Sequence, residues 1–186
     1  MKSLLIAGFF ALLLFSTLPA FYVLSTASGA EEQPVALSLS NTKVVYEMPY
    51  PGLLPDSPLY FLKIFRDRTT EFMTRDNIKK AALYLNYSDK RAVMAVQLAE
   101  KGKTQLALTT LSKAEKYAEK IPDLLADSKK QGTSPPDDLL LKVRLSNQKH
   151  LEIIQNMLQE FPQGERNTFQ DILRINKEVA QNMEQF

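Results

Sequence analysis

Cysteine and tryptophan are absent from this chain of 186 residues, and histidine occurs once. Without cysteine there is no disulfide, no thiolate metal site and no cysteine nucleophile. A single histidine excludes any site that needs two imidazoles. The 23 basic and 21 acidic residues give a net charge of +2, which is too even for the basic surface of a nucleic-acid-binding protein. What remains is a mixed-charge chain with the length of one ordinary domain.

Charge is also missing from a long N-terminal segment. The 28 residues from Ser3 to Ala30 include no charged side chain, and Leu4–Phe15 is an apolar run of 12 residues. A run of this length, followed by small residues up to Ala30, is typical of a signal peptide that is cut after Ala30. An uncleaved anchor over Leu4–Leu24 and a buried core helix are the alternatives. Residues 1–30 are therefore predicted to be a signal peptide or an N-terminal anchor, and either one places the rest outside the cytoplasm, secreted or held at the cell membrane.

Residues 31–57 differ in composition from the rest of the chain. Four prolines fall between residues 46 and 58. Proline fixes φ and disfavours helix in the residue before it, so this segment is expected to be an extended, Pro-rich linker. Its apolar residues are too many for a free linker, and it is expected to dock on the helical body through them: Tyr46, Tyr50, Leu53 and Leu54.

From residue 58 to residue 186 the pattern is helical. Apolar residues recur at three- and four-residue steps, and no strand-like alternation of useful length follows residue 48. Gly102, the Gln131–Pro136 loop and Pro162–Gly164 mark turns, and Pro122 predicts a kink or break in the helix around it. The fold class is therefore predicted to be all-α: an antiparallel helical bundle of about five helices over residues 58–186.

The first helix of this bundle has two different faces. Asp56 or Ser57 is expected to cap it, with Pro58 in its first position. An apolar face follows at helical spacing, and anchoring is expected from Leu59, Tyr60 and Leu62. The apolar face consists of Leu59, Phe61, Leu62, Phe65 and Phe72, and the other side of Lys63, Arg66, Asp67, Arg68 and Glu71.

The remaining helices have clear limits in the sequence. The second is expected from near Asp76 to about Lys101, the third from about Thr104, the fourth from Ser134–Pro135 to Phe161, and the last from about Glu165. One face of the third helix is expected to be buried: Ala107, Leu111, Ala114, Ala118, Ile121 and Leu125.

Residues 50–63 (YPGLLPDSPLYFLK), followed by Arg66-Asp67-Arg68, form a recognisable string. It resembles the start of a bacterial extracytoplasmic helical domain of unknown function, the family numbered 5667. The second helix is also similar to that family in residues 85–92 (LNYSDKRA) and 98–102 (LAEKG). The resemblance covers about residues 46–130. It implies a secreted or envelope-anchored helical domain and brings no activity or catalytic residue with it.

The Pro-rich string has two interpretations. In the first it is a packing and capping device that directs the chain into the first helix. In the second it forms an exposed docking surface. That surface would consist of Tyr46, Tyr50, Leu53 and Tyr60.

Few residues in the chain suggest chemistry. His150 lies on or beside the apolar stripe of the fourth helix, where a lone histidine is more typical of a hydrogen-bonded packing residue than of a ligand. The Glu-x-x-His pairs of di-metal bundles, nucleophile elbows and phosphate-binding glycine loops do not occur. Carboxylates recur every four residues along the third helix, which suggests a solvated face or, alternatively, a calcium site: Glu115, Glu119, Asp123 and Asp127.

These observations favour an exported, non-enzymatic helical domain that binds a cell-envelope component, with protein as the first expectation. No catalytic, cofactor-binding or metal-binding residue is predicted. An alternative is a membrane or wall surface bound through short lysine clusters, although cations at helix C-termini also complement the helix dipole. A second alternative is peptide binding by the alanine-rich second and third helices, which resemble one tetratricopeptide unit. The lysine clusters are Lys79–Lys80, Lys101–Lys103 and Lys129–Lys130.

Overall fold

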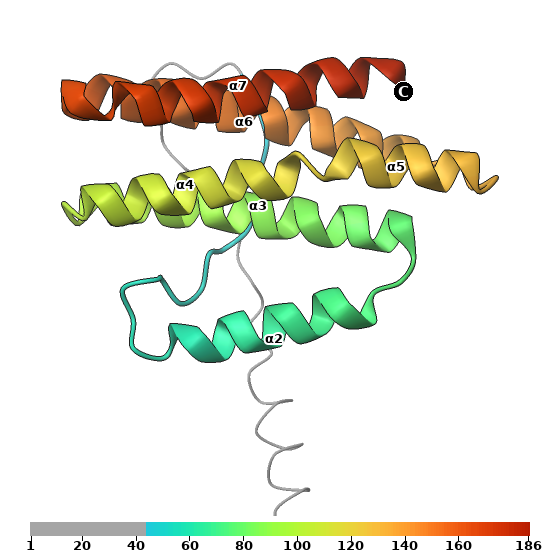
Figure 1. Ribbon diagram of the computed structural model, residues 1–186, viewed down its shortest axis with the longest axis horizontal. Helices are drawn as coiled ribbons and strands as arrows, with labels where there is room; N and C mark the ends of the chain where they lie inside the picture. Colours follow the sequence, from blue (N-terminus) through green and yellow to red (C-terminus); the bar gives the residue numbers. More distant parts are fainter. Residues whose placement is uncertain (1–43) are drawn as a thin grey trace, which may run out of the picture. The chain divides into compact units, whose positions relative to one another are not determined.

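The computed structural model describes residues 44–186, and the structural statements below concern this part of the chain. The predicted signal peptide or anchor, residues 1–30, and the first part of the linker lie outside the described residues. The described part is all-α, as predicted (Figure 1). Its α-helices are α2 (Tyr60–Met73), α3 (Asn77–Glu100), α4 (Thr104–Ala118), α5 (Ile121–Lys130), α6 (Asp137–Glu160) and α7 (Arg166–Asn182), with short 3₁₀ helices η1 (Gln163–Glu165) and η2 (Met183–Gln185).

Two antiparallel pairs of helices form the bundle. α3 and α4 are joined by a tight turn in which Gly102 has φ of +70°, and the Lys103 N–H donates to the Leu98 carbonyl at 2.8 Å. Glycine takes this left-handed conformation without steric cost, so the predicted turn is confirmed. α6 and α7 form the second pair. α3 also packs on α5 and α6, and α7 packs on α4, so that α3 occupies the centre (Figure 1).

Most of the predicted helix limits are confirmed. Asp76 caps α3, accepting from the Lys79 N–H at 2.8 Å. The predicted break near Pro122 separates α4 from α5, and proline stands in the first turn of α5, where it has no helical hydrogen bond to lose. The expected apolar face of the third helix is buried along its whole length.

The predicted start of the first helix is wrong by two residues. α2 begins at Tyr60, and its N-cap position, Leu59, has no side-chain cap. Ser57 accepts from the Leu59 N–H at 3.3 Å. Asp56 lies instead against the α3–α4 turn, where its carboxylate pairs with Lys103 at 2.8 Å and Lys101 at 3.3 Å.

The buried apolar residues form two clusters along the bundle. Met48, in the segment before α2, is only 1% exposed and belongs to one cluster, so this segment packs against the bundle. The first cluster includes Val93, Leu98, Leu111, Ile153, Ile154 and Phe169. The second includes Tyr84, Leu85, Ile121, Leu125, Val143, Val179 and Met183. No helix within residues 44–186 has the length and apolar character needed to cross a membrane.

Candidate functional site

A layer of buried polar side chains lies between the two apolar clusters. On α3, α4 and α6 its members fall between residues of one cluster and residues of the other, so all are at one level of the bundle. Each is less than 10% exposed. We call this set the polar layer: Asp89 on α3, Glu115 on α4, Ser146, Asn147 and His150 on α6, and Asn176 on α7.

His150 is the centre of the polar layer. Its Nδ1 lies 2.6 Å from Glu115 Oε1 and its Nε2 lies 3.2 Å from Asp89 Oδ1. All three side chains are almost completely buried. An imidazolium can donate from both ring nitrogens, so a protonated His150 satisfies one carboxylate on each side. The ring thereby links α6 to α3 and α4 at once.

The other members of the polar layer and Tyr46 add further hydrogen bonds to the two carboxylates. Asn176 donates to Glu115 Oε2 at 3.2 Å and to Asn147 Oδ1 at 3.0 Å, which brings α7 into the layer. Ser146 donates to Asp89 Oδ1 at 2.5 Å. The hydroxyl of Tyr46, before α2, donates to Asp89 Oδ2 at 2.6 Å. Buried polar groups are costly when unpaired, so this layer favours one arrangement of four helices and the N-terminal segment.

Burial by itself lowers the pKa of His150, but the charges and hydrogen bonds of Glu115 and Asp89 outweigh it and raise the pKa to about 10. Because the pKa of His150 is higher in the folded state than in the unfolded chain, protonation of His150 stabilises the fold. This stabilisation is complete at pH values below the unfolded pKa near 6.5. The stabilisation declines as the pH rises from there and is lost above about 10. Lys63 has the opposite effect, because burial lowers its pKa to about 8. As the pH rises through this value, Lys63 increases the free energy of unfolding.

We therefore expect the free energy of unfolding to fall by roughly 1–2 kcal/mol between pH 6.5 and pH 8, the window in which the His150 effect is larger than the opposing effect of Lys63. Urea unfolding at the two pH values measures the difference. The His150→Gln variant should lose this pH dependence. A wild-type protein that is as stable at pH 8 as at pH 6.5 would show that His150 is not held as an imidazolium.

The polar layer is poorly arranged for nucleophilic catalysis. Ser146 donates to Asp89 rather than to a ring nitrogen of His150, and both ring nitrogens already face carboxylates. His150 has no exposed surface. A general base must reach the proton that it abstracts, so these contacts describe a structural network. The expectation that His150 is a hydrogen-bonded packing residue agrees with them.

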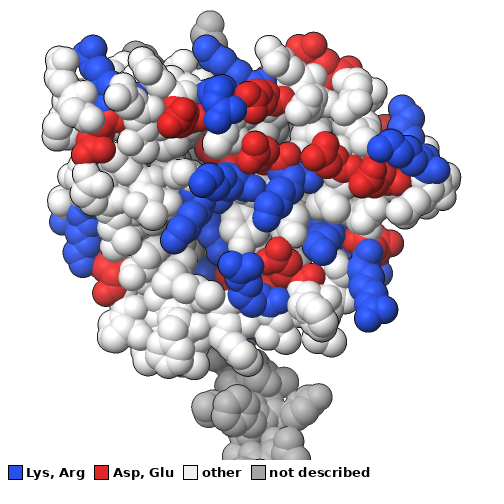
Figure 2. Space-filling view, in the orientation of Figure 1, with Lys and Arg blue, Asp and Glu red and all other residues white. Residues whose placement is uncertain are grey.

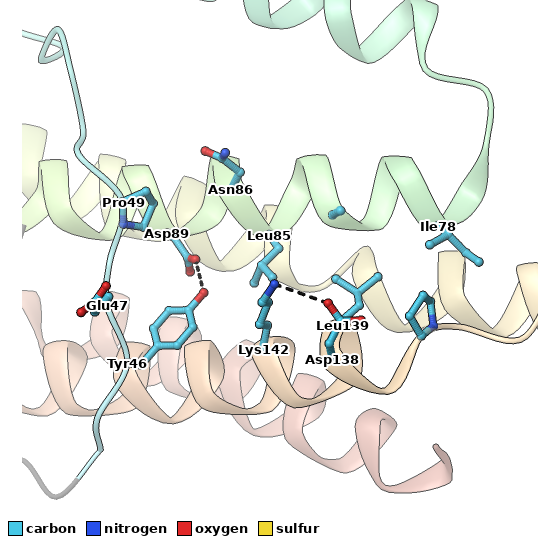
Figure 3. A pocket seen from close by; sticks show the side chains of 12 residues that line it. Tyr46, Glu47, Pro49, Ile78, Leu85, Asn86, Asp89, Asp138, Leu139 and Lys142 are labelled. Atoms are coloured by element: carbon cyan, nitrogen blue, oxygen red, sulfur yellow. Dashed lines mark hydrogen bonds and ion pairs between the residues drawn. The ribbon is translucent and has the colours of Figure 1, made fainter. Parts of the chain in front are cut away.

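A cleft of about 500 Å³ opens beside the polar layer, between α3, α6 and the segment before α2 (Figure 3). Tyr46 points across it to Asp89, and Lys142 pairs with Asp138 on its rim at 3.5 Å. Both oxygens of Asp89, the buried carboxylate of the cleft lining, have protein donors, so Asp89 does not need a ligand to satisfy it. The lining of the cleft identifies no ligand chemistry.

α2 exposes large apolar residues on the side away from the bundle. Successive residues of a helix are about 100° apart around its axis. Five of the exposed apolar residues of α2 therefore fall within about 120° of the helix circumference. Phe65 is 74% exposed and Phe72 84%, whereas Asp67 is 4% exposed. The lower edge of the face in Figure 2, where α2 lies, is accordingly mostly uncharged. We call these residues the α2 apolar strip: Phe61, Leu62, Phe65, Phe72 and Met73.

Polar contacts hold α2 in this orientation. The Tyr87 hydroxyl donates to the Asp67 carbonyl at 3.1 Å, and Arg91 lies 3.9 Å from the Asp67 carboxylate. The Tyr84 hydroxyl donates to Glu71 Oε1 at 2.7 Å, and Lys63 donates to the Pro51 carbonyl. Turning α2 to bury its phenylalanines would break all four contacts. The expected anchors Leu59 and Leu62 are therefore exposed (54% and 53%), and that prediction was wrong.

The four residues of the predicted docking surface lie in different environments. Tyr46 is turned into the bundle and hydrogen-bonded to Asp89, and Tyr60 is half-buried. Tyr50 (49%) and Leu53 (44%) are exposed. The structure thus gives Tyr46 a packing role and leaves Tyr50 and Leu53 on the surface. The apolar residues of α2 are visible in the sequence, but helical spacing alone does not say whether they face the core or the solvent.

The row of carboxylates on the third predicted helix does not form one face. Glu115 is fully buried in the polar layer, whereas Glu119, Asp123 and Asp127 are exposed, and α4 ends between them at Ala118. The solvated face predicted for the row is therefore wrong for Glu115, which lies beside the buried Leu111, Ala114 and Ala118 of the same helix. Residues 44–186 contain no group of three or more acidic or histidine side chains suited to hold a metal ion.

Comparisons with known proteins give one match. The family model described as Domain of unknown function (DUF5667) matches residues 52–186. No curated protein and no solved structure matches the chain. The match confirms the resemblance seen in residues 46–130 and extends it over α6 and α7. Because it spans well over half of the chain, the protein belongs to the DUF5667 family of domains of unknown function.

Proposed function

We propose that this protein is an exported, non-enzymatic helical domain that binds another component of the cell envelope through the α2 apolar strip. Soluble domains rarely expose a contiguous apolar surface built from side chains of this size, and such surfaces usually mark interaction sites. The carrying observation is the orientation of α2, whose charged side contacts the bundle while its phenylalanines face outward.

The export part of the proposal rests on the uncharged segment from Ser3 to Ala30. A signal peptide or an anchor there would take residues 31–186 to the outer side of the cell membrane. The absence of cysteine does not oppose this, because the two apolar clusters supply a core that needs no disulfide.

The non-enzymatic part rests on the polar layer. Its histidine, carboxylates and serine bond to one another, and its imidazole is fully buried. The groups that would be most useful for acid–base chemistry thus support the bundle.

Co-sedimentation of the purified protein with isolated envelope fragments tests the binding. Replacing Phe65 and Phe72 together with serine is expected to weaken binding at least about tenfold, because large aromatic side chains dominate interface energies. Both residues are more than 70% exposed, so the thermal unfolding curve should not move to lower temperature.

Leu141→Ser provides the matched control. Leu141 is a 56% exposed apolar residue on α6, away from the α2 apolar strip. The control should bind as the wild type does. If the Phe65 and Phe72 double variant sediments like the wild type, or if Leu141→Ser weakens binding equally, the α2 apolar strip is not the binding surface.

A further inference from the structure

The shape of the α2 apolar strip limits the kinds of binding partner that can cover it. The strip lies on one helix that stands outside the four-helix arrangement of α3, α4, α6 and α7 (Figure 1). Its five members follow the helix from its first turn to its last, at Phe61, Leu62, Phe65, Phe72 and Met73. An apolar stripe on the outside of a helix, with the polar side held by protein, is the geometry of a helix that lies in the plane of a lipid interface.

The charges around the strip favour an anionic surface. Between residues 59 and 80 the exposed charged side chains are four basic ones and one acidic one, Asp76. Asp76 is the cap of α3. The acidic residues of α2 itself, Asp67 and Glu71, contact α3. They also pair with Arg66 at 3.0 Å and with Arg68 at 4.0 Å, and both arginines remain largely exposed. The exposed basic residues are Arg66, Arg68, Arg75 and Lys79. Each basic residue near a negatively charged bilayer adds to the attraction.

The predicted N-terminal signal peptide or anchor bears on membrane attachment as well. Ser3–Ala30 has the length and composition to enter a bilayer, and only residues 31–43 separate it from Val44. These residues reach at most about 45 Å when fully extended. A retained head would thus keep Val44 within about 45 Å of the membrane, and a weak second attachment through the domain is then strengthened by high local concentration.

We propose that the α2 apolar strip binds the anionic lipid surface of the cell membrane, with the helix axis parallel to the bilayer plane. This inference rests on the proposed function and names the envelope component as lipid. The phenylalanines enter the boundary between head groups and acyl chains, and the four exposed basic residues contact phosphate groups. The rest of the bundle then stands on the membrane, with α2 between it and the lipid.

The lack of native cysteine permits a direct test. Single cysteines are introduced as Phe65→Cys and, in a second protein, Phe72→Cys, and each is labelled with a fluorophore sensitive to polarity. Each protein is purified in the form in which the cell processes it and mixed with protein-free vesicles of phosphatidylglycerol and phosphatidylcholine. Leu141→Cys, also exposed, is the matched control.

We expect the emission at positions 65 and 72 to shift to the blue with anionic vesicles and to be quenched by lipid-borne quenchers, with no change at position 141. High salt or vesicles without phosphatidylglycerol should weaken the effect. Replacing Phe72 with serine in the Phe65→Cys protein should reduce vesicle affinity at least about tenfold, because one buried phenylalanine is lost.

Three outcomes would overturn the inference. If both labels stay in water with vesicles but become protected with envelope fragments, the occupant is another envelope component, and only the lipid inference fails. If the labels stay in water in both cases, the proposed function fails as well. Protection that rises with protein concentration in the absence of vesicles would identify a second copy of the chain as the occupant.

Discussion

Replacing His150 with leucine should lower the free energy of unfolding by about 3–5 kcal/mol at pH 7. The substitution removes the one cation between Glu115 and Asp89, whose carboxylate oxygens lie 2.6 Å and 3.2 Å from the ring nitrogens. Among residues 44–186, the two buried carboxylates are then left without a positive partner. The hydrogen bonds from Asn176, Ser146 and Tyr46 remain but bring no charge.

Two further variants separate charge from packing. Gln148→Leu, at an exposed position on the same helix, should change stability by less than about 0.5 kcal/mol. Glu115→Leu combined with His150→Leu should be less destabilised than His150→Leu alone, because a buried ion pair replaced by apolar residues costs little compared with a broken one. Urea unfolding measures all three. Equal stability of the wild type and His150→Leu would contradict the role given to the polar layer.

Much of the fold could be predicted because local chemistry decides it. Glycine is the residue that takes the positive φ of the α3–α4 turn easily, and Asp76 can accept the first free N–H groups of α3. Pro122 has no N–H to donate inside a continuous helix, which predicts the break between α4 and α5. Each of these signals acts within one helical turn of the residue that carries it.

The polar layer could not be predicted in the same way. Asp89 and His150 are 61 positions apart, and no local pattern indicates that they meet. The available signal was the presence of Asn147 and His150 on an otherwise apolar stripe, which indicates a buried polar network on α6. For Glu115 the sequence indicates the opposite environment, because its regular spacing with Glu119 predicts a solvent-exposed face.

The orientation of α2 shows a different limit of sequence analysis. Helical spacing separates the phenylalanines from Asp67 and Glu71, but it does not say which face turns inward. The answer lies on α3, where Tyr84, Tyr87 and Arg91 present hydroxyl and guanidinium groups to α2. These groups contact the acidic side of α2, so the apolar side is the one left outside.

A pair of matched substitutions reports on this orientation. Phe169 on α7 is 1% exposed, and its ring meets Phe161 edge-on at 5.4 Å, whereas Phe65 on α2 is 74% exposed. Phe169→Ala should lower the free energy of unfolding by about 3–5 kcal/mol, because it removes a large buried side chain and leaves a cavity. Phe65→Ala removes the same atoms from an exposed position and should change stability by less than about 0.5 kcal/mol.

The central claim is that α2 turns its apolar face outward, and the measurement that tests it most directly is equilibrium urea unfolding of Phe65→Ala beside Phe169→Ala and the wild type. The account predicts that Phe65→Ala unfolds at the wild-type urea concentration while Phe169→Ala unfolds at a much lower one. If Phe65→Ala lowers the free energy of unfolding as much as Phe169→Ala does, Phe65 belongs to the core. That result would remove the binding surface on which both proposals rest.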